Sequence, residues 1–106
     1  MTNAAGGQSL TRVLAAIEGF FVTYGAWPSQ VRITPGYIAY LHDQALSADV
    51  YSKLTARVAL VPDPSATVVA EDENGQSYNY GVSGFPKSKP RVRAREWLGL
   101  DDLKHS

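Results

Sequence analysis

The sequence predicts an α+β fold. We expect one domain in which an N-terminal amphipathic helix and two short helices pack on a small, mostly antiparallel sheet of three or four strands, with a short C-terminal helix. Apolar residues recur at helical spacing from Leu10 to Tyr24, and the hairpin signal Asn74–Gly75 separates two runs of β-formers. The predicted helices mostly precede these strands in the chain, an order typical of α+β domains. A chain of 106 residues is long enough to bury one core.

The first predicted helix begins at Ser9, a good N-cap residue, and ends at Gly25, which tolerates a left-handed backbone. Gly19 inside this helix costs about 1 kcal/mol relative to Ala, so we expect a neighbour to approach closely there. The predicted domain spans residues 9–100. Residues 1–8 and 101–106 are expected to be flexible tails.

The middle of the chain predicts a short strand over 30–33, followed by two helices. Thr34 is a suitable cap and Pro35 a suitable first residue for a helix that runs to about Leu46. Ser47 caps the next helix. The strand over 30–33 is expected to leave one edge free, which would allow it to pair with a second copy of the chain.

The apolar run Arg57–Pro62 predicts a strand that is buried on both faces or lies centrally in the sheet, as such runs usually do. For the hairpin, Asn74–Gly75 favours a two-residue type I′ turn. That turn would place one set of side chains on a single face of the sheet, with three opposing pairs: Val69 with Tyr80, Glu71 with Tyr78, and Thr67 with Val82.

Charge is balanced but unevenly distributed. Ten basic and ten acidic residues give a formal net charge of zero, which weakens a reading as a dedicated nucleic-acid coat. Residues 63–73 carry only acids, whereas five of the nine residues from Lys87 to Arg95 are basic. The molecule is therefore expected to be dipolar.

The sequence shows no motif for catalysis, a cofactor or a metal, and we expect none of the three. Cysteine is absent, which excludes disulfides and cysteine nucleophiles. His42 sits beside Asp43 on a predicted helix, where adjacent side chains do not normally face each other. No signal peptide and no apolar run of about 18 residues is present, so we expect a soluble cytoplasmic protein without a membrane contact.

The best candidate contact surface combines hairpin aromatics with the basic segment that follows. Aromatic side chains beside cations bind macromolecules by stacking, packing and charge. The candidate binding residues are Tyr78, Tyr80, Phe85, Lys87, Lys89, Arg91, Arg93 and Arg95. We expect residues 87–95 to form an exposed arm that Trp97 anchors.

These features favour a small non-enzymatic protein that binds a protein partner or a second copy of itself, with no small-molecule ligand expected. A nucleic-acid-binding protein that uses the 87–95 arm and the hairpin tyrosines is the second hypothesis. A histidine-free endoribonuclease is the third, because the predicted order of helices and strands is similar to that of small bacterial endoribonuclease toxins. No motif of those toxins is present.

Overall fold

A computed structural model describes residues 2–65, 67–87, 90 and 92–100, with side chains from Leu10 onward. Five α-helices, one π-helical turn and four strands follow one another along this part of the chain. Their order is α1 (Thr2–Tyr24), β1 (Gln30–Ile33), α2 (Pro35–Tyr40), η1 (Leu41–Ala45), α3 (Ala48–Arg57), β2 (Ala59–Pro62), β3 (Val68–Glu71), β4 (Ser77–Asn79), α4 (Tyr80–Ser83) and α5 (Ala94–Leu98).

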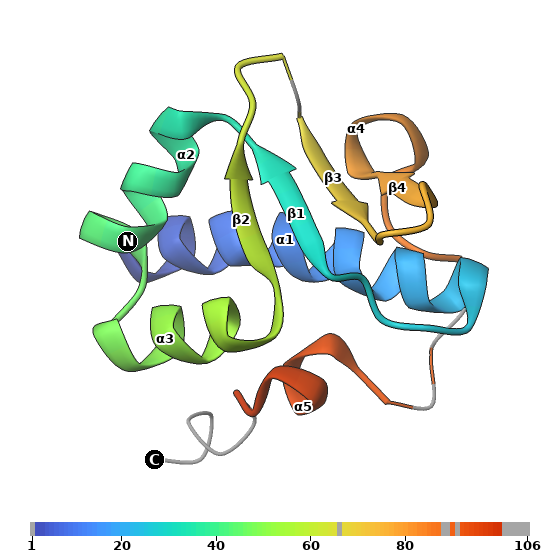
Figure 1. The fold of residues 1–106 in the computed structure, drawn as a ribbon. Coiled ribbons are helices and arrows are strands. Elements are labelled where there is room, and N and C mark those ends of the chain that lie inside the picture. The colour runs from blue at the N-terminus through green and yellow to red at the C-terminus, as the bar shows by residue number, and fades with distance from the viewer. Residues whose placement is uncertain (1, 66, 88–89, 91, 101–106) are drawn as a thin grey trace.

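The four strands form one mixed sheet in the order β2-β1-β3-β4. The pair β1–β2 is parallel, and the pairs β1–β3 and β3–β4 are antiparallel. Helix α1 crosses behind the sheet, while α2 and α3 lie beside β2 and α5 lies below (Figure 1). This arrangement confirms the predicted α+β class with a short C-terminal helix.

The core lies between α1 and the sheet. Val31 and Ile33 of β1 are fully buried, as are Ile17 and Phe20 of α1. The alternate residues of β1 point to the other face, where Arg32 forms ion pairs with Asp63 (2.9 Å) and Glu71 (2.7 Å). One face of the sheet is therefore apolar and covered, and the other carries a charged network.

Local capping signals account for the helix boundaries. The Thr34 hydroxyl accepts a hydrogen bond from the Tyr37 amide (3.3 Å), and the Ser47 hydroxyl accepts one from the Val50 amide (3.2 Å). Gly25 takes the left-handed conformation where α1 ends. Helix α1 begins at Thr2, earlier than the predicted start at Ser9. The predicted tail over 101–106 lies outside the described residues.

Two predictions about the strands are wrong. Strand β2 is an edge strand and not a central one, because its only partner is β1. Its residues are exposed or half-buried, and the strand runs beside α2 and α3 (Figure 1). Strand β1 pairs on both sides, so the edge expected to join a second copy over 30–33 is already occupied.

The predicted hairpin register is also wrong, by one residue. Val69 pairs with Asn79, and Ala70 pairs with Tyr78. The loop spans 73–75 because the Asp72 carboxylate accepts hydrogen bonds from the amides of Asn74 and Gln76 (both 3.0 Å). A one-residue shift turns each side chain to the opposite face. Tyr78 therefore points to the core side with Ala70, and not to the face of Val69.

Strand β4 is shorter than predicted. It ends at Asn79, whose side-chain oxygen accepts a hydrogen bond from the Gly81 amide (2.8 Å) and so caps helix α4. Tyr80 and Val82 consequently belong to a helical turn and not to the last hairpin strand. Among the large apolar residues that the structure describes, Val82 in this turn and Phe85 just after it are the most exposed.

Candidate functional site

Apolar side chains are exposed around α4. Val82 is 83% exposed and Phe85, just after the helix, is 57% exposed. Phe85 lines a groove of about 270 Å³ between α1 and the chain that leaves α4, and Val82 directly precedes Ser83, another residue of its lining. We call this the α4 groove. It is lined by Gly19, Val22, Thr23, Tyr78, Ser83, Phe85, Pro86 and Lys87.

Tyr78 forms the floor of the α4 groove. Its hydroxyl donates a hydrogen bond to the Gly84 carbonyl oxygen (2.7 Å), which fixes the loop after α4. Its ring fills the space that a side chain at position 19 would need, so Gly19 permits the close approach expected from the sequence. Burial raises the pKa of Tyr78. This tyrosine therefore packs on α1 and holds the loop after α4, while it also lines the groove.

Tyr80 supports the rim of the groove. Its ring meets the Phe85 ring edge to face, with centroids 5.4 Å apart and planes at 90°. Tyr80 is half-buried against the core, whereas Phe85 projects outward. Of the predicted aromatic contacts, Phe85 alone is more than half exposed, and Lys87 lies next to it as the charged residue among the described lining of the groove.

The basic segment does not form a uniformly free arm in its described part. The Arg93 guanidinium binds the Glu18 carboxylate (Nε to Oε2, 2.9 Å), and the same oxygen accepts a hydrogen bond from the Ala94 amide (2.8 Å). Glu18 is only 7% exposed. Arg95 is half-buried on α5. Lys89 and Arg91 lie outside the described residues.

Glu18, which binds the basic segment, was not among the residues predicted from the sequence. It occupies a helix in which its neighbours Ile17 and Phe20 are fully buried. A carboxylate at such a position needs a buried partner, because an unpaired buried charge is strongly unfavourable. The position of Glu18 within the apolar stripe indicated that it needs a partner. The cation-rich stretch 87–95 was where such a partner could be sought.

Trp97 anchors the C-terminal segment, as predicted. Its ring stacks on Trp27 with centroids 4.6 Å apart and planes at 6°. Trp27 in turn stacks on Phe21 at 4.0 Å and 4°. The Arg57 guanidinium lies 5.7 Å from the Trp97 ring, within cation–π range. Trp27 and Trp97 therefore join α1, the loop after it and α5, and act as packing residues.

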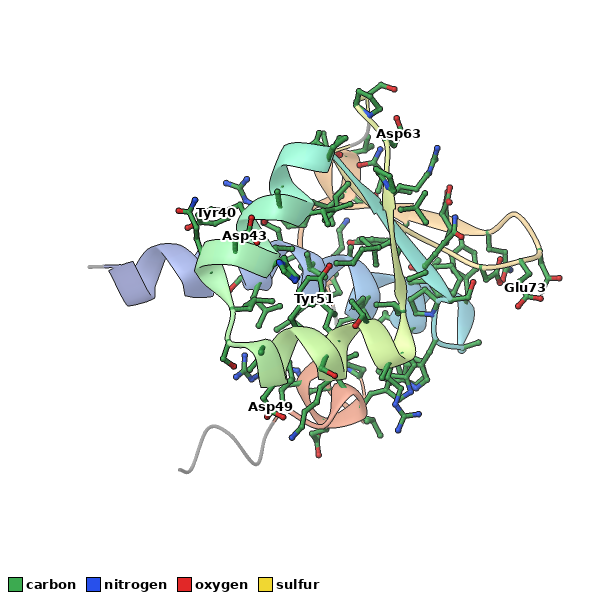
Figure 2. All side chains as sticks on the ribbon, turned by 60° about the vertical axis from the view of Figure 1, so that its left-hand side comes forward. Tyr40, Asp43, Asp49, Tyr51, Asp63 and Glu73 are labelled. Carbon is green, nitrogen blue, oxygen red and sulfur yellow. The ribbon has the colours of Figure 1, made fainter. Side chains whose placement is uncertain are left out.

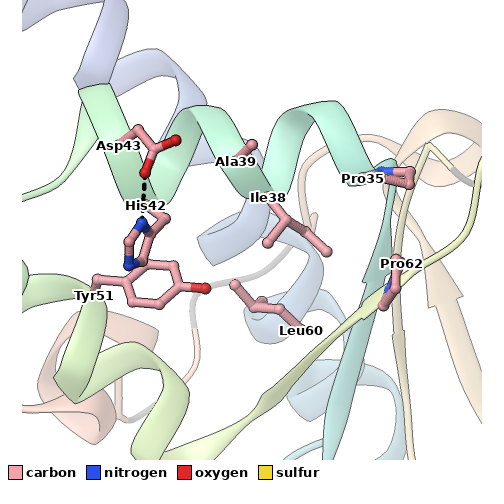
Figure 3. A pocket seen from close by; sticks show the side chains of 8 residues that line it. All are labelled: Pro35, Ile38, Ala39, His42, Asp43, Tyr51, Leu60 and Pro62. Carbon is pink, nitrogen blue, oxygen red and sulfur yellow. Dashed lines mark hydrogen bonds and ion pairs between the residues drawn. The ribbon is translucent and has the colours of Figure 1, made fainter.

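A second groove of about 400 Å³ lies between α2, η1, α3 and β2 (Figure 3). His42 and Asp43 meet at its rim, with Nδ1 and Oδ1 2.6 Å apart. The prediction that these neighbours do not face each other is wrong. They lie in a π-helical turn, marked by the 3.1 Å bond from the Leu46 amide to the Leu41 carbonyl, where adjacent side chains diverge less than in an α-helix.

The His42–Asp43 pair is solvent-exposed, with 62% and 64% of the side chains accessible. The groove below it is mostly apolar and contains the Tyr51 ring, which meets the His42 ring edge to face at 4.9 Å. Asp43 and Tyr51 lie well away from the hairpin tip at Glu73 (Figure 2). Within the described part of the chain, no three acidic or histidine side chains are grouped as metal ligands.

Comparison with protein-family models, curated proteins and solved structures finds no match for this chain. Among the residues that the structure describes, no helix has the length and apolar character needed to cross a membrane. A functional assignment therefore rests on the chemistry of the surface itself.

Proposed function

We propose that this chain is a non-enzymatic binding domain that contacts a protein partner through the α4 groove. The observation that carries the proposal is the exposure of Val82 and Phe85 beside a concave site. Adjacent exposed apolar side chains are unfavourable in water, and in stable proteins they commonly mark interaction sites. An aromatic side chain at the rim of a groove is a typical anchor of an interface.

The lining of the groove defines the segment that it receives. Val22, Tyr78 and Pro86 offer an apolar surface, and Lys87 adds one positive charge. No acidic residue belongs to the described lining. An apolar side chain flanked by a carboxylate complements both features. The partner is therefore a protein segment with a large apolar residue next to Asp or Glu.

Two alternatives receive less support from the geometry. A nucleic-acid site would need free aromatic faces and free cations, yet the Tyr78 ring is packed on α1 and Arg93 is paired with Glu18. A histidine-free endoribonuclease would need the same residues for proton transfer and charge stabilisation. A cytoplasmic location stays a prediction from the sequence.

A peptide-display selection tests the proposal. Wild-type protein is used for selection, and the Phe85→Ser variant is used for counter-selection. Calorimetry then measures the selected peptides against wild type, Phe85→Ser, Val82→Ser and the control His42→Ala, which lies in the other groove. We expect peptides with an apolar residue beside an acidic one, and at least a roughly tenfold loss of affinity in Phe85→Ser and Val82→Ser but not in His42→Ala.

Two results would overturn the proposal. One is a selection that yields no peptide with preference for wild type over Phe85→Ser. The other is tighter binding of labelled single-stranded RNA or DNA than of any selected peptide, with log affinity falling against log salt by about 0.7 per phosphate contacted. Binding of the chain to itself, lost in Phe85→Ser, would identify a second copy as the partner.

A further inference from the structure

A further pocket, distinct from the two grooves described above, adjoins the beginning of α4. It has a volume of about 390 Å³ and is bounded by α1, the start of α2, β3 and α4. This volume falls within the range of small-molecule sites in proteins. Its described lining consists of Arg12, Thr34, Tyr37, Thr67, Val68, Tyr80 and Gly81. We call it the Arg12 pocket. It shares no described lining residue with the α4 groove.

The charge of Arg12 is not compensated inside this pocket. Arg12 is exposed on α1, and within the described residues it forms no hydrogen bond and no ion pair. None of the described lining residues is acidic. Arg32 and Arg93, in contrast, form ion pairs with carboxylates. The pocket thus holds one guanidinium and no counter-charge among these residues.

The available polar groups around Arg12 are hydrogen-bond donors. The Thr34 oxygen accepts the Tyr37 amide hydrogen (3.3 Å), so its own hydroxyl hydrogen remains available for a ligand. The Tyr80 hydroxyl has no hydrogen-bond partner within the described part of the chain. Thr67 differs, since it donates to the Asn79 side chain (2.8 Å). These hydroxyls can donate to a ligand, and the guanidinium, which only donates, selects an anionic acceptor.

The remaining walls are apolar and include two aromatic residues. Tyr37 and Tyr80 are half-buried and pack against the core, and Val68 is buried. Aromatic rings stack favourably on planar apolar groups. The close approach of Gly81 to Thr67 brings α4 onto the end of β3 and closes the pocket on that side. The site therefore combines an apolar, aromatic interior with a single cationic group.

We propose that the Arg12 pocket binds a small aromatic monocarboxylate. The aromatic ring packs against the tyrosine and valine walls, and the carboxylate accepts two parallel hydrogen bonds from the Arg12 guanidinium. One cation matches one negative charge, whereas a phosphate monoester dianion would leave a charge uncompensated. This inference is independent of the proposed protein contact, because it depends on different residues.

Matched ligand pairs test this inference by two-dimensional NMR of the labelled full chain. Benzoate, 2-naphthoate and indole-3-acetate are each titrated beside the corresponding neutral carboxamide, up to about 10 mM, which covers the weak affinity of such small ligands. We expect at least one carboxylate to bind saturably, with shifts at the amides of Thr34, Thr67 and Gly81. The carboxamide is expected to bind at least about tenfold more weakly, since it lacks the charge-assisted hydrogen bonds.

Variants assign the binding to Arg12. Arg12→Gln is expected to lose at least about tenfold in affinity, and Arg12→Lys to lose part of that, because it keeps the charge but not the planar fork. Arg57→Gln is the control, since it removes another exposed arginine, beside Trp97. Equal binding of carboxylate and carboxamide, equal loss in the Arg57 variant, largest shifts at amides remote from the pocket, or no saturable binding would each overturn the proposal. The ligand comparison needs no variant, so it decides even if Arg12→Gln misfolds.

Discussion

At the scale of single residues, Glu18 joins the first helix to the last. Its carboxylate binds both the Arg93 side chain and the Ala94 amide at the start of α5. We expect Glu18→Gln to lower the free energy of unfolding by about 1–3 kcal/mol, because the buried side chain loses its charge and weakens its bonds to the half-exposed Arg93 side chain and to the Ala94 amide. Urea denaturation measures this.

The matched control for Glu18 is Asp49→Asn. Asp49 forms an exposed pair with Lys53 at 3.7 Å, and such pairs contribute little to stability, typically under about 1 kcal/mol. If Glu18→Gln were no more destabilising than Asp49→Asn, the Glu18–Arg93 pair would not hold the C-terminal segment.

Gly19 provides a second test at this scale. A methyl group there would overlap the Tyr78 ring, so we expect Gly19→Ala to destabilise the fold by about 1–3 kcal/mol, although alanine is the better helix former by about 1 kcal/mol. Gly36→Ala is the control, since nothing lies within 4 Å of its added methyl group. Urea denaturation should show Gly36→Ala to be neutral or stabilising. Similar results for both glycines would contradict the packing of Tyr78 on α1.

At the scale of elements, mutations in the hairpin loop distinguish the predicted type I′ turn from the observed loop. Gly75 has a φ of 86°, and the described backbone has no non-glycine residue with positive φ, Asn74 included. We expect Gly75→Ala to cost about 1–2 kcal/mol and Asn74→Ala to cost much less. A type I′ turn would need positive φ at both positions. Equal losses in thermal or urea unfolding would therefore support the predicted turn over the observed loop.

The charged face of the sheet makes stability depend on pH. Hydrogen bonds from the Ser65 amide and hydroxyl, followed by the charge of Arg32, hold the pKa of Asp63 below its ordinary value. A carboxyl with a lowered folded-state pKa contributes stability above its unfolded pKa, about pH 4, and this is lost as pH falls through the folded pKa. We expect the urea concentration at the unfolding midpoint to decrease as the pH is lowered below about 4. The decrease should be smaller in Asp63→Asn. An equal acid dependence in both proteins would contradict this role.

The sequence predicts elements better than it predicts their pairing. Thr34, Pro35 and Ser47 act on the residues next to them, so the helices that they begin are visible in the chain. The hairpin register depends on the Asp72 side chain, which accepts hydrogen bonds from two loop amides. The Asn74–Gly75 pattern does not reveal these bonds. The edge position of β2 is set by how the chain crosses from β1, and an apolar run alone carries no such information.

In the candidate site, too, local features were easier to predict than long-range contacts. Phe85 and Lys87 were recognisable as surface residues because glycine and proline surround them in the sequence. The burial of Tyr78 follows from the one-residue shift in register, and the pairing of Arg93 with Glu18 joins residues 75 positions apart. Such long-range relations come from packing and not from local pattern.

At the scale of the whole molecule, α1 and the sheet enclose the core, and α4 contributes residues to both proposed binding sites. The α4 groove receives Ser83 from the end of this short helix, and the Arg12 pocket receives Tyr80 and Gly81 from its start. The Tyr80 ring contacts Phe85 at 5.4 Å, so the two sites share a wall. Ligand binding in one is therefore expected to shift NMR signals weakly in the other.

The most direct test of the central claim, that the α4 groove is a protein-binding site, is an NMR titration of the labelled chain with the tightest selected peptide. We expect saturable shifts at the amides of Gly19, Val22, Ser83 and Lys87, and their loss in Phe85→Ser, which removes a mostly exposed side chain and should leave stability nearly unchanged. Shifts centred on the His42 groove, or shifts retained in Phe85→Ser, would contradict the claim.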